Sequence, residues 1–419
     1  MHILYVSQHF PPEMGAPSAR VFELGKHWVR SGHRVTVLTG FPNHPTGKIP
    51  LEYRRRFRLL TCREEISGIE VVRTWLFPAP NRFPIERILN YTSFFASACI
   101  RGSVLSRPDV VIGTSPQLLA GLCGWWLSRR YYCPFVFEVR DLWPESLLAS
   151  GIGREGSMFI RTLDMISSFL CRHSQKIVVV TDAFKDNLIQ QRGIDPGNIE
   201  VITNGVEPEM FLPDVDRDET RRALDVEGKF VISYIGTIGM AHGLATLLRT
   251  AQTLQHKARD IVFLLIGEGA ERERLQALGA EMGLTNVRFV EQQPREVVPR
   301  LIAATDVCLV LLRNSELFKT VLPSKMFEFF SGARPVILGV DGEARRILEK
   351  ASAGIYVKPE DSDALADAVM LMYARPDLRS QYGQSARRFV MQEYSREKKA
   401  ADYISVLKSL QPSLSEAST

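Results

Sequence analysis

The sequence has few cysteines, and none of them is spaced as a pair of metal ligands. Its 419 residues include six cysteines without a Cys-x-x-Cys pair, which is unlike a zinc site or a small disulfide-rich secreted domain. A His-Glu-x-x-His motif, a Walker A phosphate loop and a close group of histidines and cysteines are also missing. We therefore expect reduced thiols in a cytoplasmic protein, with no metal site and no resident cofactor.

Long hydrophobic segments and targeting signals are scarce as well. Residues 110–128 carry no charged side chain, but residues 113–117, Gly-Thr-Ser-Pro-Gln, interrupt them, so we predict a strand, a turn and a helix rather than a membrane span. Residues 1–7 lack the basic start of a signal peptide. Hydrophobic residues at 45% and charged residues at 24% are ordinary for globular chains and exclude a disordered or fibrous protein.

Positive charge is concentrated in the first half of the chain. Residues 1–200 contain 24 Lys and Arg against 17 Asp and Glu, whereas residues 201–419 contain 28 against 30. The basic side chains include Arg54, Arg55, Arg56 and Arg58, and the apolar stretch 85–100 follows them. Such a region suits an anionic membrane surface; the alternative is a solvated basic loop beside a buried helix.

Short β-branched runs alternate with longer helical patterns, which is typical of α/β folds with parallel sheets buried on both faces. Turn-forming residues at 203–208 divide the chain. We expect two Rossmann-like domains, residues 1–203 and 204–394, with a C-terminal helix in 395–419 packing back on the first, and a ligand in a cleft between them. The predicted strands are residues 2–7, 34–39, 69–74, 109–113, 135–139, 176–181, 230–236, 261–267, 287–290, 306–312, 334–339 and 354–357.

The turn after the first predicted strand, residues 10–20, contains Gly15 just before a helix. A glycine there can bring backbone amides close to an anionic ligand, or it can simply form the turn. The motif is not Gly-x-Gly-x-x-Gly, so an ordinary dinucleotide site is disfavoured. His9 and His44 lie in loops and are candidates to line the expected cleft.

A second candidate segment of the first half, residues 137–145, follows a predicted strand. Its Arg140, Asp141 and Glu145 would lie near the expected cleft. A carboxylate there could bind sugar hydroxyls or stabilise positive charge. The alternative for Asp141 is an ion pair with Arg140 or a helix cap.

In the second half, residues 234–243 join an apolar strand to a helix through a glycine-rich turn. Backbone N–H groups of such a turn can bind phosphate; the candidate ligand-binding residues are Gly236, Thr237, Gly239, His242 and Gly243.

Residues 322–328 start a further helix, with Pro323 predicted at its first position. Ser324 and Lys325 can meet a phosphate through a hydroxyl and an ammonium group, while Glu328 could hold ribose hydroxyls. The alternative for Glu328 is a solvated glutamate beside a lysine.

Several motifs in this order resemble one family. They are FPPEMGAPSARVFELGKHWVRSGHRVTVLTG, VRDLWPES, VITNGVEPEMFLPD, YIGTIGMAHGLATLL, LLIGEGAERERL, VRFVEQQPREVVPRLIAATDVCL, LPSKMFEFFSGARPVI and KPEDSDALADAV. The chain resembles the retaining GT-B glycosyltransferases of family 4, especially bacterial transferases that build O-antigen and capsule repeats, such as the N-acetyl-L-fucosamine transferases.

The resemblance implies a UDP-sugar donor held mainly by the C-terminal domain. Glu328 matches the second glutamate of the family's Glu-x7-Glu pattern, which binds the donor ribose. The first glutamate of that pattern would fall at Thr320.

The family's two cations for the donor diphosphate would fall at Thr237 and His242, so neither is present. Lys325 and Lys319 are the candidates to replace them, with His242 able to donate a hydrogen bond.

The resemblance also implies a polyprenyl-diphosphate-linked saccharide as acceptor, bound by the basic N-terminal domain at the inner face of the cell membrane, and no nucleic acid partner. Asp141 stands where many relatives have a histidine. Front-face attack assisted by the leaving phosphate requires no protein nucleophile, and we assign none. Two other functions stay open: a UDP-sugar epimerase or hydrolase on the same fold, and a non-catalytic nucleotide-binding module.

Overall fold

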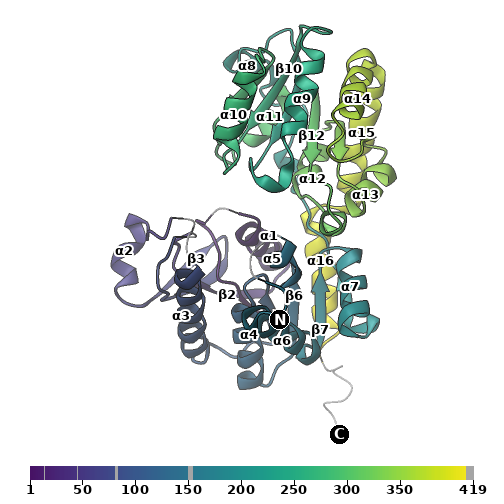
Figure 1. The fold of residues 1–419 in the computed structure, drawn as a ribbon. Coiled ribbons are helices and arrows are strands. Elements are labelled where there is room, and N and C mark those ends of the chain that lie inside the picture. Colours follow the sequence, from purple (N-terminus) through teal and green to yellow (C-terminus); the bar gives the residue numbers. More distant parts are fainter. Residues whose placement is uncertain (14, 45, 81–83, 150–153, 412–419) are drawn as a thin grey trace. The chain divides into compact units, whose positions relative to one another are not determined.

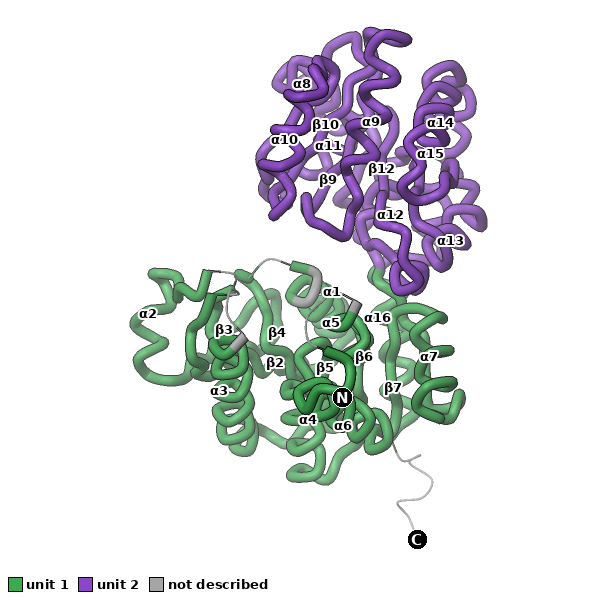
Figure 2. Tube along the Cα trace, viewed as in Figure 1, with its two compact units in different colours: residues 1–204, 396–419 green, residues 205–395 purple. Residues whose placement is uncertain are grey.

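The computed structural model describes residues 1–13, 15–44, 46–80, 84–149 and 154–411. It divides into two compact units (Figure 1, Figure 2). Unit 1 contains Met1–Asn204 and the chain from Arg396 on, and unit 2 contains Gly205–Ser395. Each unit has one sheet with helices packed against it.

The sheet of unit 1 has the strand order β3-β4-β2-β1-β5-β6-β7-β8. All neighbouring strands are parallel except β3 and β4. Its strands are β1 (His2–Val6), β2 (Arg34–Gly40), β3 (Thr61–Ile66), β4 (Ile69–Thr74), β5 (Val110–Thr114), β6 (Phe135–Val139), β7 (Lys176–Val179) and β8 (Ile199–Val201). Its helices are α1 (Ala16–Arg30), α2 (Leu51–Phe57), α3 (Pro84–Gly102), α4 (Leu118–Tyr131), α5 (Glu145–Ala149), α6 (Met158–His173), α7 (Asp182–Arg192), η1 (Pro196–Asn198) and α16 (Arg396–Lys408).

The sheet of unit 2 is parallel throughout, in the order β11-β10-β9-β12-β13-β14. Its strands are β9 (Phe230–Ile235), β10 (Ile261–Ile266), β11 (Val287–Val290), β12 (Val307–Leu311), β13 (Val336–Gly339) and β14 (Gly354–Tyr356). Its helices are η2 (Pro208–Met210), α8 (Arg217–Ala223), η3 (Met240–His242), α9 (Ala245–Leu254), α10 (Arg272–Glu281), α11 (Val298–Ala304), η4 (Leu317–Thr320), α12 (Lys325–Ser331), α13 (Glu343–Ala351), α14 (Ser362–Ala374) and α15 (Pro376–Glu393).

Burial on both faces of the sheets explains why the strands read as continuous apolar runs. In β1, Ile3 and Tyr5 join the core beside α1 and α16, while Leu4 and Val6 join the core beside α3 and α4. Successive side chains of a strand point to opposite faces, so a strand covered on both sides needs apolar residues at every position.

Every predicted strand is present, which confirms the two-domain α/β prediction, but the sequence analysis missed β3 and β8. The missed β3 lies at the sheet edge and pairs antiparallel with β4, so the sheet of unit 1 is mixed. Three consecutive residues of β3, Arg63, Glu64 and Glu65, are charged, and two of them are exposed, so the sequence lacks the apolar run by which the other strands were predicted. The other, β8, has only three residues.

The uncharged stretch from residue 110 to residue 128 forms β5 and most of α4, as predicted. Among the described residues, no helix combines the length and hydropathy needed to cross a bilayer. One detail of the helix prediction was wrong: α12 begins at Lys325 with Ser324 at its N-cap, so Pro323 precedes the helix instead of opening it.

Helix α16 returns to unit 1 after the chain has completed unit 2, and it packs against α1. The rings of Trp28 and Tyr403 meet edge to face with 5.2 Å between their centroids. The Trp28 indole also donates a hydrogen bond to the Ala400 carbonyl, at 3.1 Å. Both aromatic side chains are completely buried, so α16 completes the core of unit 1.

Tyr403→Ala should therefore lower the free energy of unfolding of unit 1 by about 3 to 5 kcal/mol, the usual cost of removing a large buried aromatic ring. Chemical denaturation followed by tryptophan fluorescence would measure this change. Ser405→Ala, at an exposed position of the same helix, should stay within about 0.5 kcal/mol of the wild type. Equal stability of the two variants would contradict this role of α16.

Candidate functional site

In unit 2, the candidate site is built around the turn that follows β9. Gly236 leaves the strand with φ of 140°, a conformation that side chains other than glycine rarely adopt. Gly239 precedes η3, and Gly243 separates it from the N-cap of α9. Thr237 is exposed, and its carbonyl accepts a 2.7 Å hydrogen bond from the Tyr234 hydroxyl.

A second loop, after β10, packs directly against this turn. A Cβ atom on Gly267 would collide with the Gly236 carbonyl oxygen, and one on Gly269 would collide with the Ile238 carbonyl oxygen. The two loops are also joined by a hydrogen bond from the Ile238 amide to the Glu268 carbonyl, at 2.9 Å. The sequence analysis did not assign a role to Gly267 and Gly269, although a Gly-x-Gly directly after a buried strand was a usable signal.

Lys325 fills the space that a side chain at Gly236 would occupy. A Cβ atom on Gly236 would lie 2.6 Å from Lys325 Nζ, which itself lies 4.0 Å from the ring centroid of the buried Tyr234. Burial lowers the pKa of Lys325 to about 8, although the negative charge of Glu328 opposes this effect. Lys325 and Gly236, which were predicted separately as ligand-binding residues, thus lie against each other, and Tyr234 is a neighbouring residue that the sequence analysis overlooked.

His242 lies beside the same aromatic ring, with 5.8 Å between its centroid and that of Tyr234. Burial, together with the charge of Lys325, lowers the pKa of His242 to about 4. The imidazole is therefore neutral at physiological pH, so it cannot replace a missing cation by its charge.

The other predicted donor residues have different surroundings. Ser324 is exposed, and its hydroxyl does not cap α12. Glu328 is half-buried, one turn after Lys325 on the same helix. The Lys319 ammonium forms a 2.6 Å ion pair with Glu316, which gives Lys319 a partner other than the glycine turn.

In unit 1, His9 and His44, each predicted as a candidate acceptor-side residue, lie next to each other. Their ring centroids are 5.3 Å apart. Between them, the Glu13 carboxylate contacts His9 Nδ1 at 2.6 Å and accepts hydrogen bonds from the backbone amides of Asn43 and His44, at 2.7 and 2.9 Å. Burial opposes ionisation of Glu13, but these bonds prevail and lower its pKa. Gly15 is exposed and forms the N-cap of α1.

Arg140 belongs to a buried charge network centred on Glu138, a residue that the sequence analysis missed. The Glu138 side chain is completely buried and forms a 2.9 Å ion pair with Arg20. It accepts a hydrogen bond from Tyr5 and lies 3.7 Å from Arg140 Nε. Burial alone would raise the pKa of Glu138, but the positive charges of Arg20 and Arg140 keep it lowered.

Asp141 accepts hydrogen bonds from the Ser146 hydroxyl and from the Trp143 indole, the latter at 3.2 Å. Burial raises its pKa, and these bonds oppose the rise. Glu145 forms a 3.0 Å ion pair with Arg192. Both carboxylates thus have local protein partners.

The arrangement offers two sets of groups, each at the carboxyl ends of its own sheet. Unit 2 provides bare backbone and an ammonium group, which suits an anionic ligand. Unit 1 provides histidines and carboxylates, which suit hydroxyl groups. Among the residues that the structure describes, no group of three or more His, Cys, Asp or Glu side chains is placed to hold a metal ion.

Known protein families match the two units separately. Residues 15–205 match a Glycosyl transferase 4-like domain, and residues 216–389 match the Glycosyl transferases group 1 family. WcaI of Escherichia coli (strain K12), which is named for glycosyl transfer in colanic acid biosynthesis, is 24% identical over 88% of this chain and 91% of its own.

Solved structures share the same architecture. Sucrose-phosphate synthase from Thermosynechococcus elongatus superposes with a TM-score of 0.76 at 19% identity, covering 98% of both chains. HepE of Anabaena in complex with UDP gives a TM-score of 0.73 at 17% identity, covering 98% of this chain and 100% of its own.

The chain is thus a glycosyltransferase with the GT-B fold. It belongs with the family 4-like glycosyltransferases, since it carries both of their domains. These matches confirm the predicted resemblance at this level, and the narrower likeness to N-acetyl-L-fucosamine transferases stays a prediction.

The close approach of the two loops makes Gly267 intolerant of a side chain. Gly267→Ala should cost roughly 3 kcal/mol or more of stability, because the new Cβ adds overpacking against the Gly236 carbonyl to backbone strain. The matched control is Gly228→Ala, which has positive φ but nothing within 4 Å of its added Cβ and should cost about 1 kcal/mol. Thermal unfolding would measure both variants, and similar losses would argue against the clash.

Proposed function

We propose that this glycosyltransferase is a retaining enzyme of cell-surface polysaccharide synthesis, such as that of an O-antigen or capsule. It moves a sugar, an N-acetylated hexosamine or deoxyhexosamine, from a UDP-sugar to a saccharide carried on a polyprenyl diphosphate. The observation that carries the proposal is the ammonium group of Lys325 seated against the bare backbone of the glycine turn.

The donor would bind to unit 2. Two kinds of group at the turn at Gly236–Gly243 favour a diphosphate. The backbone N–H groups present the positive ends of their dipoles, and the Lys325 ammonium carries a full positive charge. Glu328 is proposed to accept hydrogen bonds from the ribose hydroxyls, with the base near Glu291 at the end of β11. The presence of UDP in the HepE complex, whose fold is similar, supports UDP as the nucleotide.

The acceptor would bind to unit 1, near His9, His44 and Asp141. In the proposed front-face reaction, the bond between the anomeric carbon and the diphosphate breaks, and the acceptor oxygen bonds to that carbon on the same face. The hydroxyl proton passes to the leaving phosphate oxygen. Arg140 is proposed to help orient the sugar, and the Asp141 carboxylate to bind its hydroxyls and stabilise its developing positive charge.

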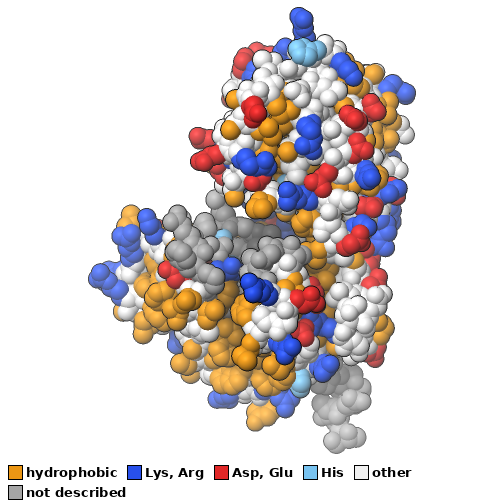
Figure 3. Space-filling view, viewed as in Figure 1, with side chains coloured by type: hydrophobic (Ala, Val, Ile, Leu, Met, Phe, Trp, Pro, Cys, Tyr) orange, Lys and Arg blue, Asp and Glu red, His pale blue; other side chains and the backbone are white. Residues whose placement is uncertain are grey.

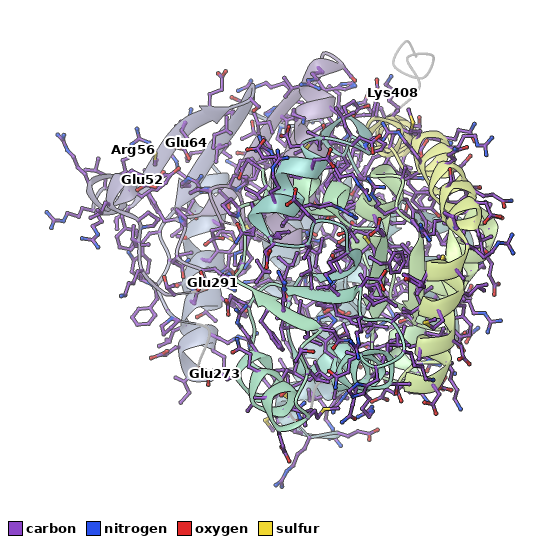
Figure 4. All side chains as sticks on the ribbon, turned by 90° about the horizontal axis from the view of Figure 1, so that it is seen from above. Glu52, Arg56, Glu64, Glu273, Glu291 and Lys408 are labelled. Carbon is purple, nitrogen blue, oxygen red and sulfur yellow. The ribbon has the colours of Figure 1, made fainter. Side chains whose placement is uncertain are left out.

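A basic and apolar surface of unit 1 supports a place at the inner face of the cell membrane. Arg54, Arg55 and Arg58 are exposed, and Arg56 forms a 3.2 Å ion pair with Glu64 (Figure 4). Hydrophobic side chains gather beside these basic groups on the surface of α2 and α3 (Figure 3). Those that are exposed are Leu51, Leu59, Leu60, Ile85, Ile88, Leu89, Ile100 and Val104.

A groove of about 530 Å³ opens within this surface. Trp75 lines the groove, and its ring stacks on that of Phe57 in the basic helix α2, with 6.4 Å between the ring centroids. The groove suits the hydrocarbon chain of an anionic lipid, because its apolar lining can hold the chain while the basic side chains beside it attract the headgroup. The groove is lined by Leu60, Thr61, Thr74, Trp75, Ser97, Ile100, Arg101 and Val104.

Lys325→Ala should weaken UDP binding by about 1.5 to 3 kcal/mol, the value of a hydrogen bond to a charged group. Since the pKa of Lys325 is about 8 in the free protein, wild-type affinity for UDP should fall as pH rises above 8, where the ammonium loses its proton. The Ala variant should lose this dependence. Calorimetric titration between pH 7 and 9.5 would measure both effects, with the exposed Lys257→Ala as matched control.

Transfer itself is tested by incubating the protein with UDP-sugars, with and without membrane lipid extract. The proposal expects sugar to appear on lipid only when extract is present, with its anomeric configuration retained. Rapid UDP release with a free altered sugar and no acceptor would identify an epimerase or hydrolase. Binding of UDP without turnover on any extract would leave a nucleotide-binding module.

For the membrane surface, replacing Arg54, Arg55, Arg56 and Arg58 by glutamine should reduce binding to anionic vesicles by roughly 100- to 1000-fold, because each basic residue near such a surface contributes about 1 kcal/mol. Co-sedimentation with vesicles would measure the change. A control variant of equal charge carries glutamine at four exposed positions of unit 2: Arg222, Arg249, Arg259 and Arg388. Equal binding by both variants would mean that the cluster is only a solvated face of α2.

A further inference from the structure

The glycine turn of unit 2 lacks charged side chains of its own. Thr237 is uncharged, and the lowered pKa of His242 keeps that ring neutral. A diphosphate carries at least two negative charges, and Lys325 supplies one positive charge. A second cation has to come from a neighbouring element.

Arg313, just beyond the end of β12, lies against the other end of this turn. Its backbone amide donates a 2.9 Å hydrogen bond to the Ala241 carbonyl. A Cβ atom on Gly243 would lie 3.4 Å from Arg313 Cγ. Lys325 therefore flanks the turn at Gly236, and Arg313 flanks it at Gly243.

The Arg313 side chain starts beside the turn, and its guanidinium is accessible. The side chain is exposed, and no hydrogen bond or ion pair among the described residues occupies its guanidinium. It lies near Glu271, because its charge adds to that of Arg274 in lowering the Glu271 pKa. The Glu271 amide in turn donates a 3.0 Å hydrogen bond to the Ile238 carbonyl, at the middle of the turn.

Two carboxylates face Arg313, and both have other partners. Glu271 forms an ion pair with Arg274. Glu360, whose Cγ would lie 3.7 Å from a Cβ on Gly243, accepts a 3.0 Å hydrogen bond from the Asn314 amide. The guanidinium thus remains available to an anion.

We infer that Arg313 supplies the second positive charge to the donor diphosphate, replacing a cation that the turn itself does not carry. The inference rests on the proposed donor site and adds to it a binding residue from a different strand. A guanidinium suits this role because its fork of N–H donors matches phosphate oxygens.

Affinity measurements with UDP, inorganic pyrophosphate and uridine test this assignment. Arg313→Gln should lower the affinity for UDP and for pyrophosphate by about tenfold or more, which is the loss expected when a hydrogen bond to a charged group is removed. Uridine binding, followed by ligand-observed NMR, should not change, and Arg313→Lys should restore part of the affinity. Loss of uridine binding to the same degree would overturn the inference, because it would indicate general damage to the site.

Two control variants separate phosphate binding from a structural role. Glu271→Gln removes a carboxylate near Arg313 and should leave UDP affinity unchanged or raise it, whereas a weakening would indicate that Arg313 serves the fold. Arg259→Gln removes an exposed positive charge elsewhere in unit 2 and should have no effect. If Lys325→Ala weakens UDP and Arg313→Gln does not, this inference alone fails. If neither variant changes UDP binding, the proposed donor site fails with it.

Discussion

Backbone lies against backbone where β9 and β10 end, and this close approach organises the candidate donor site. It is possible only because Gly236 and Gly267 have no side chains. The Lys325 ammonium lies where a Cβ atom of Gly236 would be, and the Gly236 carbonyl oxygen lies where a Cβ atom of Gly267 would be. Hydrogen bonds between the two loops then fix the turn. A rigid, uncovered stretch of main chain results, and such a stretch can bind an anion without first having to reorganise.

Packing around Tyr234 determines the position of the Lys325 ammonium and the charge state of His242. Tyr234 is completely buried, and its ring face attracts the Lys325 ammonium, since an aromatic face carries partial negative charge. The same burial keeps His242 neutral. Unit 1 uses the opposite arrangement, because its buried Glu138 is compensated by Arg20 and Arg140. Removing one partner of such a buried pair is expensive, so that network favours a single geometry around Arg140.

The fold was largely predictable from the sequence because strands buried on both faces leave continuous apolar runs. The edge strand β3 was not, since three of its six residues are charged and two of these, Arg63 and Glu65, are exposed. Within the site, the glycine turn and Lys325 could be found from local motifs. Tyr234 and Arg313 could not be assigned in this way, because their roles arise from contacts between segments far apart in the chain, whereas the Gly-x-Gly at Gly267 was a local signal that went unused. The sequence likewise did not reveal which side chains would bond to Lys319 and Asp141.

The chain passes between its two units twice, since α16 returns to pack on α1. Unit 1 is therefore discontinuous in sequence, and a fragment ending at Asn204 would leave the Trp28 indole in water. Such a fragment would be expected to aggregate, and the missing helix would have to be fused to it or added as a separate peptide. On the ribosome, the first half of the protein likewise completes its core only after nearly all of the polypeptide has been made, so its folding is delayed until the end of translation.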